Sequence, residues 1–155
     1  MPTYRFRQCA AVLTVCAVLT ACSAGNDDEQ YVEQKVETLY NEAVNSLESG
    51  DYKSASKQFD EVERQHPYSI WATKAQIMAA FSHYQADQYD EAVIGLERFI
   101  RLHPGHRDIA YAYYLKALSY YEQIVDEKKD LQSITNAKKT FEIIVTNFPN
   151  TEYSI

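Results

Sequence analysis

The chain has 155 residues, 46% of them apolar, and a formal net charge of −7 at pH 7. Its acidity argues against nucleic acid and against an anionic bilayer surface as partners, because both carry negative charge. The apolar content suffices for one elongated core, which favours a single folded domain.

The first 21 residues have the order of a secretory signal peptide. Arg5 and Arg7 precede an uncharged apolar run at residues 9–20, and this run is too short to span a bilayer. Residues 19–22 resemble a bacterial lipobox, which implies cleavage before Cys22 and acylation of its thiol. The alternative is a soluble exported protein that is cut slightly later and keeps Cys22 as a free thiol.

Cleavage before Cys22 leaves no second cysteine, because the other two lie in the removed segment. No disulfide chemistry then remains, although export leads to an oxidising compartment. In the lipobox resemblance, Ser23 implies sorting to the outer membrane. Residues 24–30 carry three acids and no apolar residue beyond alanine. We therefore expect residues 22–30 to form a solvated, acylated tether.

Residues 31–155 contain the same pattern three times, with copies 37 and then 45 residues apart. In each copy an alanine is followed four positions later by a large apolar residue and twelve positions later by a proline. Alanine allows two helices to cross closely, the apolar residue falls on the same face, and the proline ends the second helix. The matching residues are Ala55, Phe59 and Pro67, then Ala92, Leu96 and Pro104, then Ala137, Phe141 and Pro149.

The first helix of each pair repeats as well. Ala43, Ala80 and Ala117 are 37 residues apart, and each lies in an apolar stripe at helical spacing. This order of residues, at a period of about 34, is typical of the tetratricopeptide repeat, whose helix pairs bury their apolar faces by stacking. The sequence therefore predicts an all-α, tetratricopeptide-like solenoid of three helix pairs.

The pattern also predicts where the repeats and their helices begin and end. The domain over residues 31–155 divides into repeats at about 31–67, 68–104 and 105–149, with the start of a fourth at 150–155. Helices are expected at 31–49, from a turn at 50–51 to about 65, from about 70 to 84, and, after a turn at 86–88, from about 90 to 102. The polar residues that lengthen the third repeat, around 126–133, are expected to form a loop. No capping helix follows, so we interpret the chain as the N-terminal part of a longer protein.

Aromatic side chains on the first helices are the candidate binding residues. Five tyrosines occur between Tyr111 and Tyr121, and on one helix they must point to several faces. Exposed, clustered tyrosine is typical of peptide contacts, although each tyrosine taken singly could instead fill a helix contact. Trp71 is expected to pack between repeats. Because first helices line the inner face of such solenoids, the groove candidates are Tyr40, Ile77, Phe81, Tyr84, Tyr111, Tyr114 and Tyr121.

Catalytic and metal-binding patterns are weak in this sequence. His103 and His106 lie in a turn with proline and glycine, and no further metal ligand follows at the usual spacing. The four glycines are scattered, so no phosphate-binding loop is possible. The carboxylates fall on solvated helix faces. We therefore expect no enzyme activity, no metal and no cofactor.

Two segments carry a resemblance to a known family. ERFIRLHPGH at residues 97–106 and YAYYL at residues 111–115 resemble the BamD (YfiO) family, outer-membrane lipoproteins of the β-barrel assembly machinery. The resemblance implies about five tetratricopeptide repeats and a lipid-anchored protein on the periplasmic face of the outer membrane. The partners it implies are BamA, other lipoproteins of the machinery, and the C-terminal peptides of unfolded outer-membrane proteins.

A second class of function shares this architecture. Tetratricopeptide pilotins are lipoproteins that carry secretin or pilus subunits to the outer membrane. Only the segment around residues 98–104 and its continuation separate the two alternatives. The resemblance therefore favours a binding scaffold in outer-membrane protein assembly, whose aromatic groove suits a strand that ends in an aromatic residue.

Overall fold

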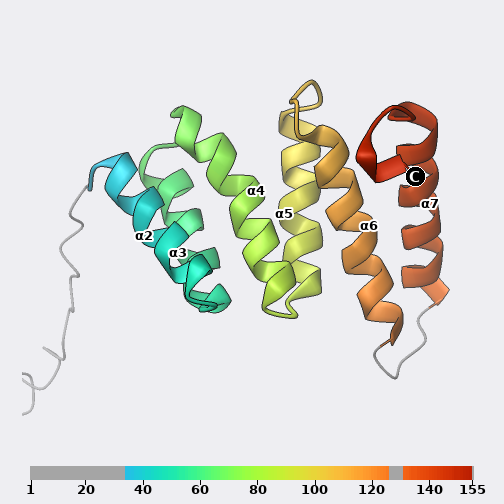
Figure 1. Ribbon diagram of the computed structural model, residues 1–155, viewed down its shortest axis with the longest axis horizontal. Helices are drawn as coiled ribbons and strands as arrows, with labels where there is room; N and C mark the ends of the chain where they lie inside the picture. Colours follow the sequence, from blue (N-terminus) through green and yellow to red (C-terminus); the bar gives the residue numbers. More distant parts are fainter. Residues whose placement is uncertain (1–33, 126–130, 155) are drawn as a thin grey trace, which may run out of the picture. The chain divides into compact units, whose positions relative to one another are not determined.

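The computed structural model describes residues 34–125 and 131–154, so the predicted signal peptide and tether lie outside the described residues. Within them the chain forms six α-helices followed by a short 3-10 helix, η1 (Figure 1). The helices are α2 (Val36–Glu48), α3 (Tyr52–Gln65), α4 (Ile70–Gln85), α5 (Tyr89–Leu102), α6 (Ile109–Val125), α7 (Leu131–Asn147) and η1 (Glu152–Ser154). The prediction of an all-α fold is confirmed.

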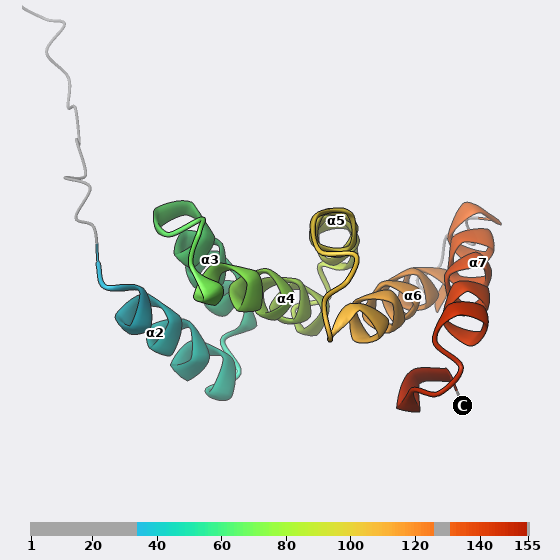
Figure 2. The same cartoon turned by 90° about the horizontal axis from the view of Figure 1, so that it is seen from above.

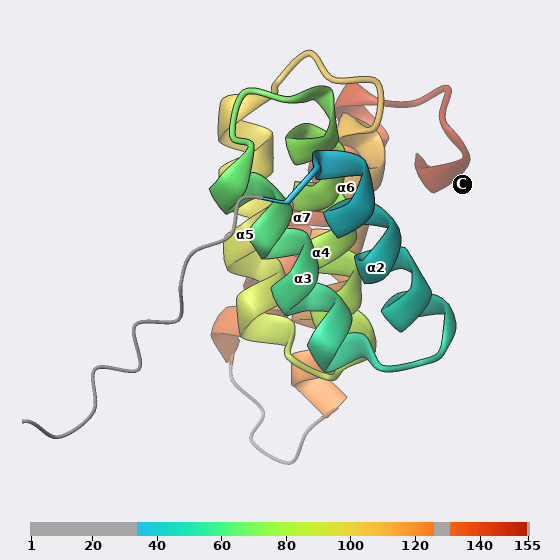
Figure 3. The same cartoon turned by 90° about the vertical axis from the view of Figure 1, so that its left-hand side faces the viewer.

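The helices stack in chain order as antiparallel neighbours. Each helix packs on the next, and α4 also contacts both α2 and α6. In the described part of the chain, the backbones of α3, α5 and α7 do not approach one another in this way, although long side chains can still bridge them. The first helices of the pairs therefore form a closely spaced inner layer and the second helices a splayed outer layer (Figures 2 and 3). None of the helices in residues 34–125 and 131–154 is long and apolar enough to cross a membrane.

Both predicted turns within the first two repeats are present, and they are equivalent through the repeat. Gly50 has φ 81° and Asp87, 37 residues later, has φ 60°. Both are in the left-handed region, which glycine adopts freely and aspartate tolerates better than most residues. Asp51 then caps α3 by accepting a hydrogen bond from the Ser54 amide at 3.2 Å.

Small residues at the helix crossings allow this stacking. Five of the six alanines at the predicted crossings are at most 1% exposed and Ala137 is 4% exposed. At Gly95 an added Cβ would lie 3.6 Å from the Ala80 Cβ, an ordinary van der Waals distance, so the gap between α4 and α5 is about one methyl group wide there. Trp71 is partly buried and its ring lies 4.8 Å from that of Tyr40, which confirms its packing role.

One predicted boundary is wrong. The loop expected around residues 126–133 ends earlier, because α7 begins at Leu131. Ser133 is buried and its hydroxyl donates to the Gln123 Oε1 at 3.2 Å, which fixes the first turn of α7 against α6. Polar composition alone suggested a loop, whereas these polar side chains satisfy one another across the helix pair.

Enlarging a crossing alanine should destabilise the solenoid. Ala92 is fully buried, so Ala92→Leu should lower the free energy of unfolding by roughly 1–3 kcal/mol through overpacking. Urea denaturation measures the loss. Gln85→Leu places the same side chain on an exposed position at the end of α4 and should change stability by less than about 0.5 kcal/mol. Equal losses in the two variants would contradict the crossing.

Candidate peptide-binding face

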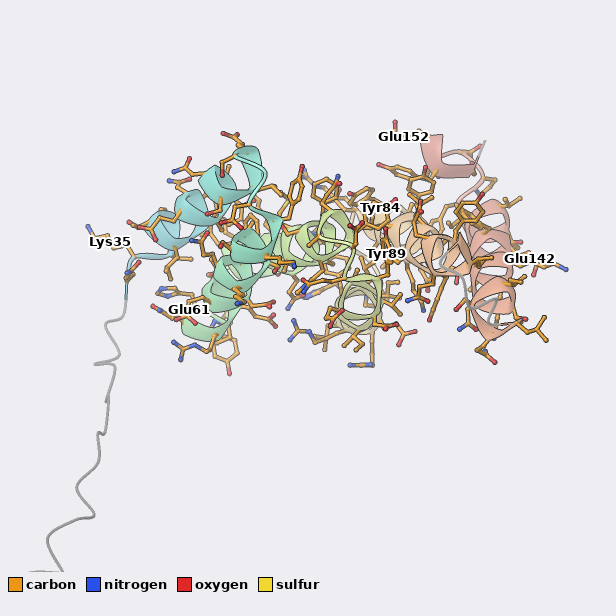
Figure 4. All side chains as sticks on the ribbon, turned by 90° about the horizontal axis from the view of Figure 1, so that it is seen from below. Lys35, Glu61, Tyr84, Tyr89, Glu142 and Glu152 are labelled. Atoms are coloured by element: carbon orange, nitrogen blue, oxygen red, sulfur yellow. The ribbon has the colours of Figure 1, made fainter. Side chains whose placement is uncertain are left out.

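The inner layer brings five tyrosines together, and we call them the tyrosine cluster: Tyr84, Tyr89, Tyr111, Tyr114 and Tyr153. Tyr84 lies in the last turn of α4 and Tyr89 begins α5, with ring centroids 5.7 Å apart (Figure 4). Tyr153 in η1 lies 5.7 Å from Tyr111 and 5.3 Å from Tyr114, both in α6. Tyr84 and Tyr111 pack against the same core cluster, which links the two halves, and burial, followed by Glu122 and Tyr114, raises the pKa of Tyr84. Four elements thus contribute to one aromatic surface.

Three of the seven predicted groove residues belong to this cluster: Tyr84, Tyr111 and Tyr114. Tyr121 lies on the same helix as the last two and is 52% exposed. Phe81 is partly buried against the core beneath the cluster. These five residues follow one side of α4 and α6, as their spacing predicted.

The other two predicted residues are engaged in packing. Tyr40 contacts Phe59 edge to face at 5.4 Å and also Trp71, so its ring helps to join α2, α3 and α4. Ile77 is only 7% exposed and packs with Leu96 and Phe99 in the core. Helical spacing placed both side chains on the right stripe, but it could not tell how deeply each one lies. A role in peptide binding stays a prediction for all seven residues.

Sequence reasoning missed two members of the cluster. Tyr89 begins a second helix, where no binding residue is expected, and its proximity to Tyr84 depends on the tight turn at Asp87. Tyr153 lies beyond the last long helix, where no periodicity assigns a face. The parallel between residues 150–155 and the start of a repeat was the only available signal, since a further first helix would also reach the inner layer.

The cluster combines neutral hydroxyls with surrounding carboxylates. Burial raises the pKa of Tyr111 to about 12, with smaller effects of neighbouring tyrosines. Burial and a hydrogen bond of 2.8 Å to the Asp87 carboxylate raise the pKa of Tyr89. Glu122 raises the pKa of Tyr84 and Tyr89 further through its charge. The surface therefore offers aromatic faces and hydroxyl donors inside an acidic rim, which suits aromatic or cationic groups better than anions.

The outer layer carries two grooves at equivalent positions of neighbouring repeats. One lies between α3 and α5 over α4, and the other lies between α5 and α7 over α6. Asp60 and His83 in the first groove stand 37 residues before Glu97 and Tyr120 in the second. A hydrogen bond to Asp60 raises the pKa of His83 against the opposing effect of burial. The repeat thus places a groove at the same position in both repeats, but Asp60 and His83 in the first groove are replaced by Glu97 and Tyr120 in the second.

Ion pairs join the helices along these outer grooves. Arg98 of α5 pairs with Glu63 of α3 at 2.6 Å, and Glu63 also accepts from the Gln76 amide at 2.8 Å. In the second groove Lys116 pairs with Glu97 at 2.8 Å. These contacts satisfy the charges that the splayed outer helices leave half-buried. We assign them a structural role.

The two histidines of the second inter-repeat turn have hydrogen-bond partners. His103 Nε2 lies 3.1 Å from the Gln76 Oε1, and His106 Nδ1 accepts from the Asp108 amide at 3.2 Å. His106 thereby takes the place that Ser69 holds 37 residues earlier, where the serine hydroxyl accepts from the Ala72 amide. The described residues contain no group of three or more side chains arranged to hold a metal ion.

Comparison with known proteins gives a consistent set of relatives. The model of the YfiO family, described as outer membrane lipoprotein, matches residues 32–155. A Caulobacter vibrioides protein named outer membrane protein assembly factor BamD is 40% identical, over 97% of this chain and 52% of its own length. Proteins of the same name from Rickettsia prowazekii and Neisseria gonorrhoeae are 43% and 32% identical, over 94% and 92% of this chain. They are covered over 58% and 57% of their lengths, so this chain spans about half the length of the curated relatives it matches.

The buried tyrosines should make the fold sensitive to alkali. The folded state holds the Tyr111 proton up to about pH 12, whereas an unfolded tyrosine releases it near pH 10, so stability should fall as the pH rises from 10 to 12. Tyr111→Phe has no proton to lose and should show a shallower fall, measured as the urea midpoint against pH. Tyr68→Phe, which alters a fully exposed side chain, is the control. Identical slopes for wild type and Tyr111→Phe would contradict the assignment.

Proposed function

This chain belongs to the YfiO family of outer membrane lipoproteins, and from that premise we propose that it is a non-catalytic scaffold of outer-membrane protein assembly. The observation that carries the proposal is the tyrosine cluster on the inner layer, a surface suited to an extended peptide with aromatic side chains. The relatives named above are all called assembly factors. They lend no support to the pilotin alternative.

The proposed location is the periplasmic face of the outer membrane. Acylated Cys22 would hold the chain on the bilayer through the tether, and residues 23–33 can extend by at most about 3.5 Å each, or roughly 40 Å in all. The domain would therefore remain close to the membrane surface without being embedded in it. BamA and the other lipoproteins of the machinery are the proposed protein partners.

The proposed ligand is the C-terminal segment of an unfolded outer-membrane protein. Its aromatic side chains would stack on the rings of the tyrosine cluster, and its backbone carbonyls would accept from tyrosine hydroxyls. Asp87 and Glu122 beside the cluster would repel a free terminal carboxylate. We therefore propose that the aromatic side chains enter the cluster while the carboxylate stays outside its acidic rim.

Loss of the acylated cysteine should release the protein. After cleavage the acyl chains on Cys22 would be the main apolar anchor, so Cys22→Ala should move the protein from the membrane fraction to the soluble periplasmic fraction. Ser23→Ala keeps the thiol and serves as the control, with fractionation and immunoblotting as the measurement. Retention of Cys22→Ala in the membrane fraction would contradict the lipid anchor.

Removing aromatic rings from the inner side of α6 should weaken peptide binding without unfolding the domain. Tyr114→Ser and Tyr121→Ser together remove two proposed contact residues, and the expected cost is about 2 kcal/mol, or roughly thirtyfold in affinity. Fluorescence titration of a peptide with an aromatic end measures the affinity, and circular dichroism on the same sample measures helicity. An amidated peptide should bind at least as tightly as the free acid.

The same helix supplies a matched control for this test. Tyr120 lies on the opposite side of α6, in the outer groove, where its hydroxyl faces Glu97 at 3.4 Å. Tyr120→Ser should therefore leave the peptide affinity unchanged. Equal losses of affinity in the control and in the double variant would assign the peptide to another surface or to a general loss of packing.

A further inference from the structure

The two edges of the solenoid, where the helices begin and end, differ in charge. We call one the proline edge; it comprises the start of α2 and the turns that contain Pro67 and Pro104, along the top of Figure 1. Lysine and arginine at this edge are Lys35, Arg64, Lys74, Arg101 and Arg107, and acids there are Glu37, Glu61, Glu63, Asp108 and Glu152. The described acids near the opposite edge are Glu48, Asp51, Asp87, Asp90, Glu91 and Glu122, against Lys53. The net negative charge thus lies mainly away from the proline edge.

The proline edge also presents large apolar side chains to solvent. Tyr68 is fully exposed, Ile70 is 73% exposed, and Leu102, the last residue of α5 before the turn with Pro104, is 55% exposed. Pro67 ends α3, and the Ser69 amide donates to the His66 carbonyl at 3.0 Å, so this turn is fixed with Tyr68 outward. Among the described residues, the Tyr68 ring belongs to neither core cluster and packs against no other aromatic ring.

The chain enters the domain beside this turn. The Gln34 amide donates to the Gln65 Oε1 at 2.9 Å, and the Gln34 carbonyl lies 2.7 Å from His66 Nε2. Gln34 is thus held next to the residues that precede Tyr68. An anchor at Cys22 would pull on the domain at the proline edge, which turns that edge toward the bilayer.

We propose that the proline edge lies on the phospholipid surface, with Tyr68 and Ile70 inserted at the level of the headgroups. The proposal rests on the lipid anchor of the proposed function. Tyrosine and a neighbouring aliphatic residue suit the interface, where one part of the surroundings is apolar and the other wet. The acidic edge would point away from anionic lipid, because like charges repel.

The lipid anchor explains why a few exposed apolar side chains are sufficient to hold the proline edge on the bilayer. Two or three side chains bind a bilayer weakly, and the overall negative charge opposes binding from solution. A tether that can span at most about 40 Å makes the contact intramolecular, so that its effective concentration is high. The helix axes would then stand at a steep angle to the membrane surface. The inner layer would face sideways above the bilayer and remain open to a peptide.

Trp71 provides a direct test, because it is the only tryptophan in the chain and follows Ile70. The processed protein is placed on vesicles of phosphatidylethanolamine and phosphatidylglycerol whose acyl chains carry bromine near the headgroup. Contact of the proline edge with lipid should quench Trp71 fluorescence relative to unbrominated vesicles. Tyr68→Ser with Ile70→Ser should abolish most of the quenching, and helicity by circular dichroism should stay unchanged, since both side chains are exposed.

Ile94→Ser is the matched control, because Ile94 is 67% exposed on α5 away from the proline edge, and it should leave the quenching as in wild type.

Flotation of the vesicles is measured first and tests the anchor by itself. Where acylation is absent, a maleimide lipid coupled to Cys22 supplies the anchor, so the quenching still decides the proposal. Anchored protein without quenching would overturn it, and so would a Tyr68 and Ile70 variant that quenches normally. If wild type shows no quenching and the Tyr68 and Ile70 variant loses binding to a protein partner, the two side chains contact that partner and not lipid.

Discussion

The close crossing of helices at small residues is the constraint on which the rest of the structure depends. Ala80 is buried where α4 crosses α5, facing Gly95 with room for little more than a methyl group, and the repeat places the buried Ala43 and Ala117 in equivalent positions. Because each crossing is tight, the first helices of successive repeats also touch one another. The distinction between an inner layer and an outer layer follows from these few alanines and glycines.

This difference between layers determines which side chains each face can carry. On the inner layer, a ring of α4 meets one of α5 and rings of α6 meet one of η1, and Tyr84 and Tyr111 pack against the same core cluster. On the outer layer the second helices are splayed, so the long side chain of Arg98 on α5 is needed to reach Glu63 on α3, and Lys116 of α6 reaches Glu97 from the floor of the second groove. Aromatic groups inside and ion pairs outside are therefore consequences of the same geometry.

Most of the fold could be predicted from sequence, because it is encoded in residues that recur at a fixed spacing. The crossing alanines, the turns at Gly50 and Asp87, and the family resemblance around residues 97–106 were all visible, and the family and the all-α fold are confirmed. The site was less predictable. Periodicity assigns a residue to a stripe, but the depth of Ile77 and the approach of Tyr153 depend on contacts between elements, which no single helix pattern contains.

The net charge of the chain does not show how the charged side chains are distributed over the fold. The value of −7 argues against binding to an anionic surface, yet it is a sum over two edges with different compositions. The turn beside Tyr84 and Tyr89 contributes acids to the far edge, while arginine and lysine nearly balance the acids of the edge that holds Gln34. A tethered molecule meets the bilayer with one edge only, so the local composition of that edge governs the contact. The same acids would keep the end of the tyrosine cluster that holds Tyr84 and Tyr89 clear of lipid headgroups and available to a peptide.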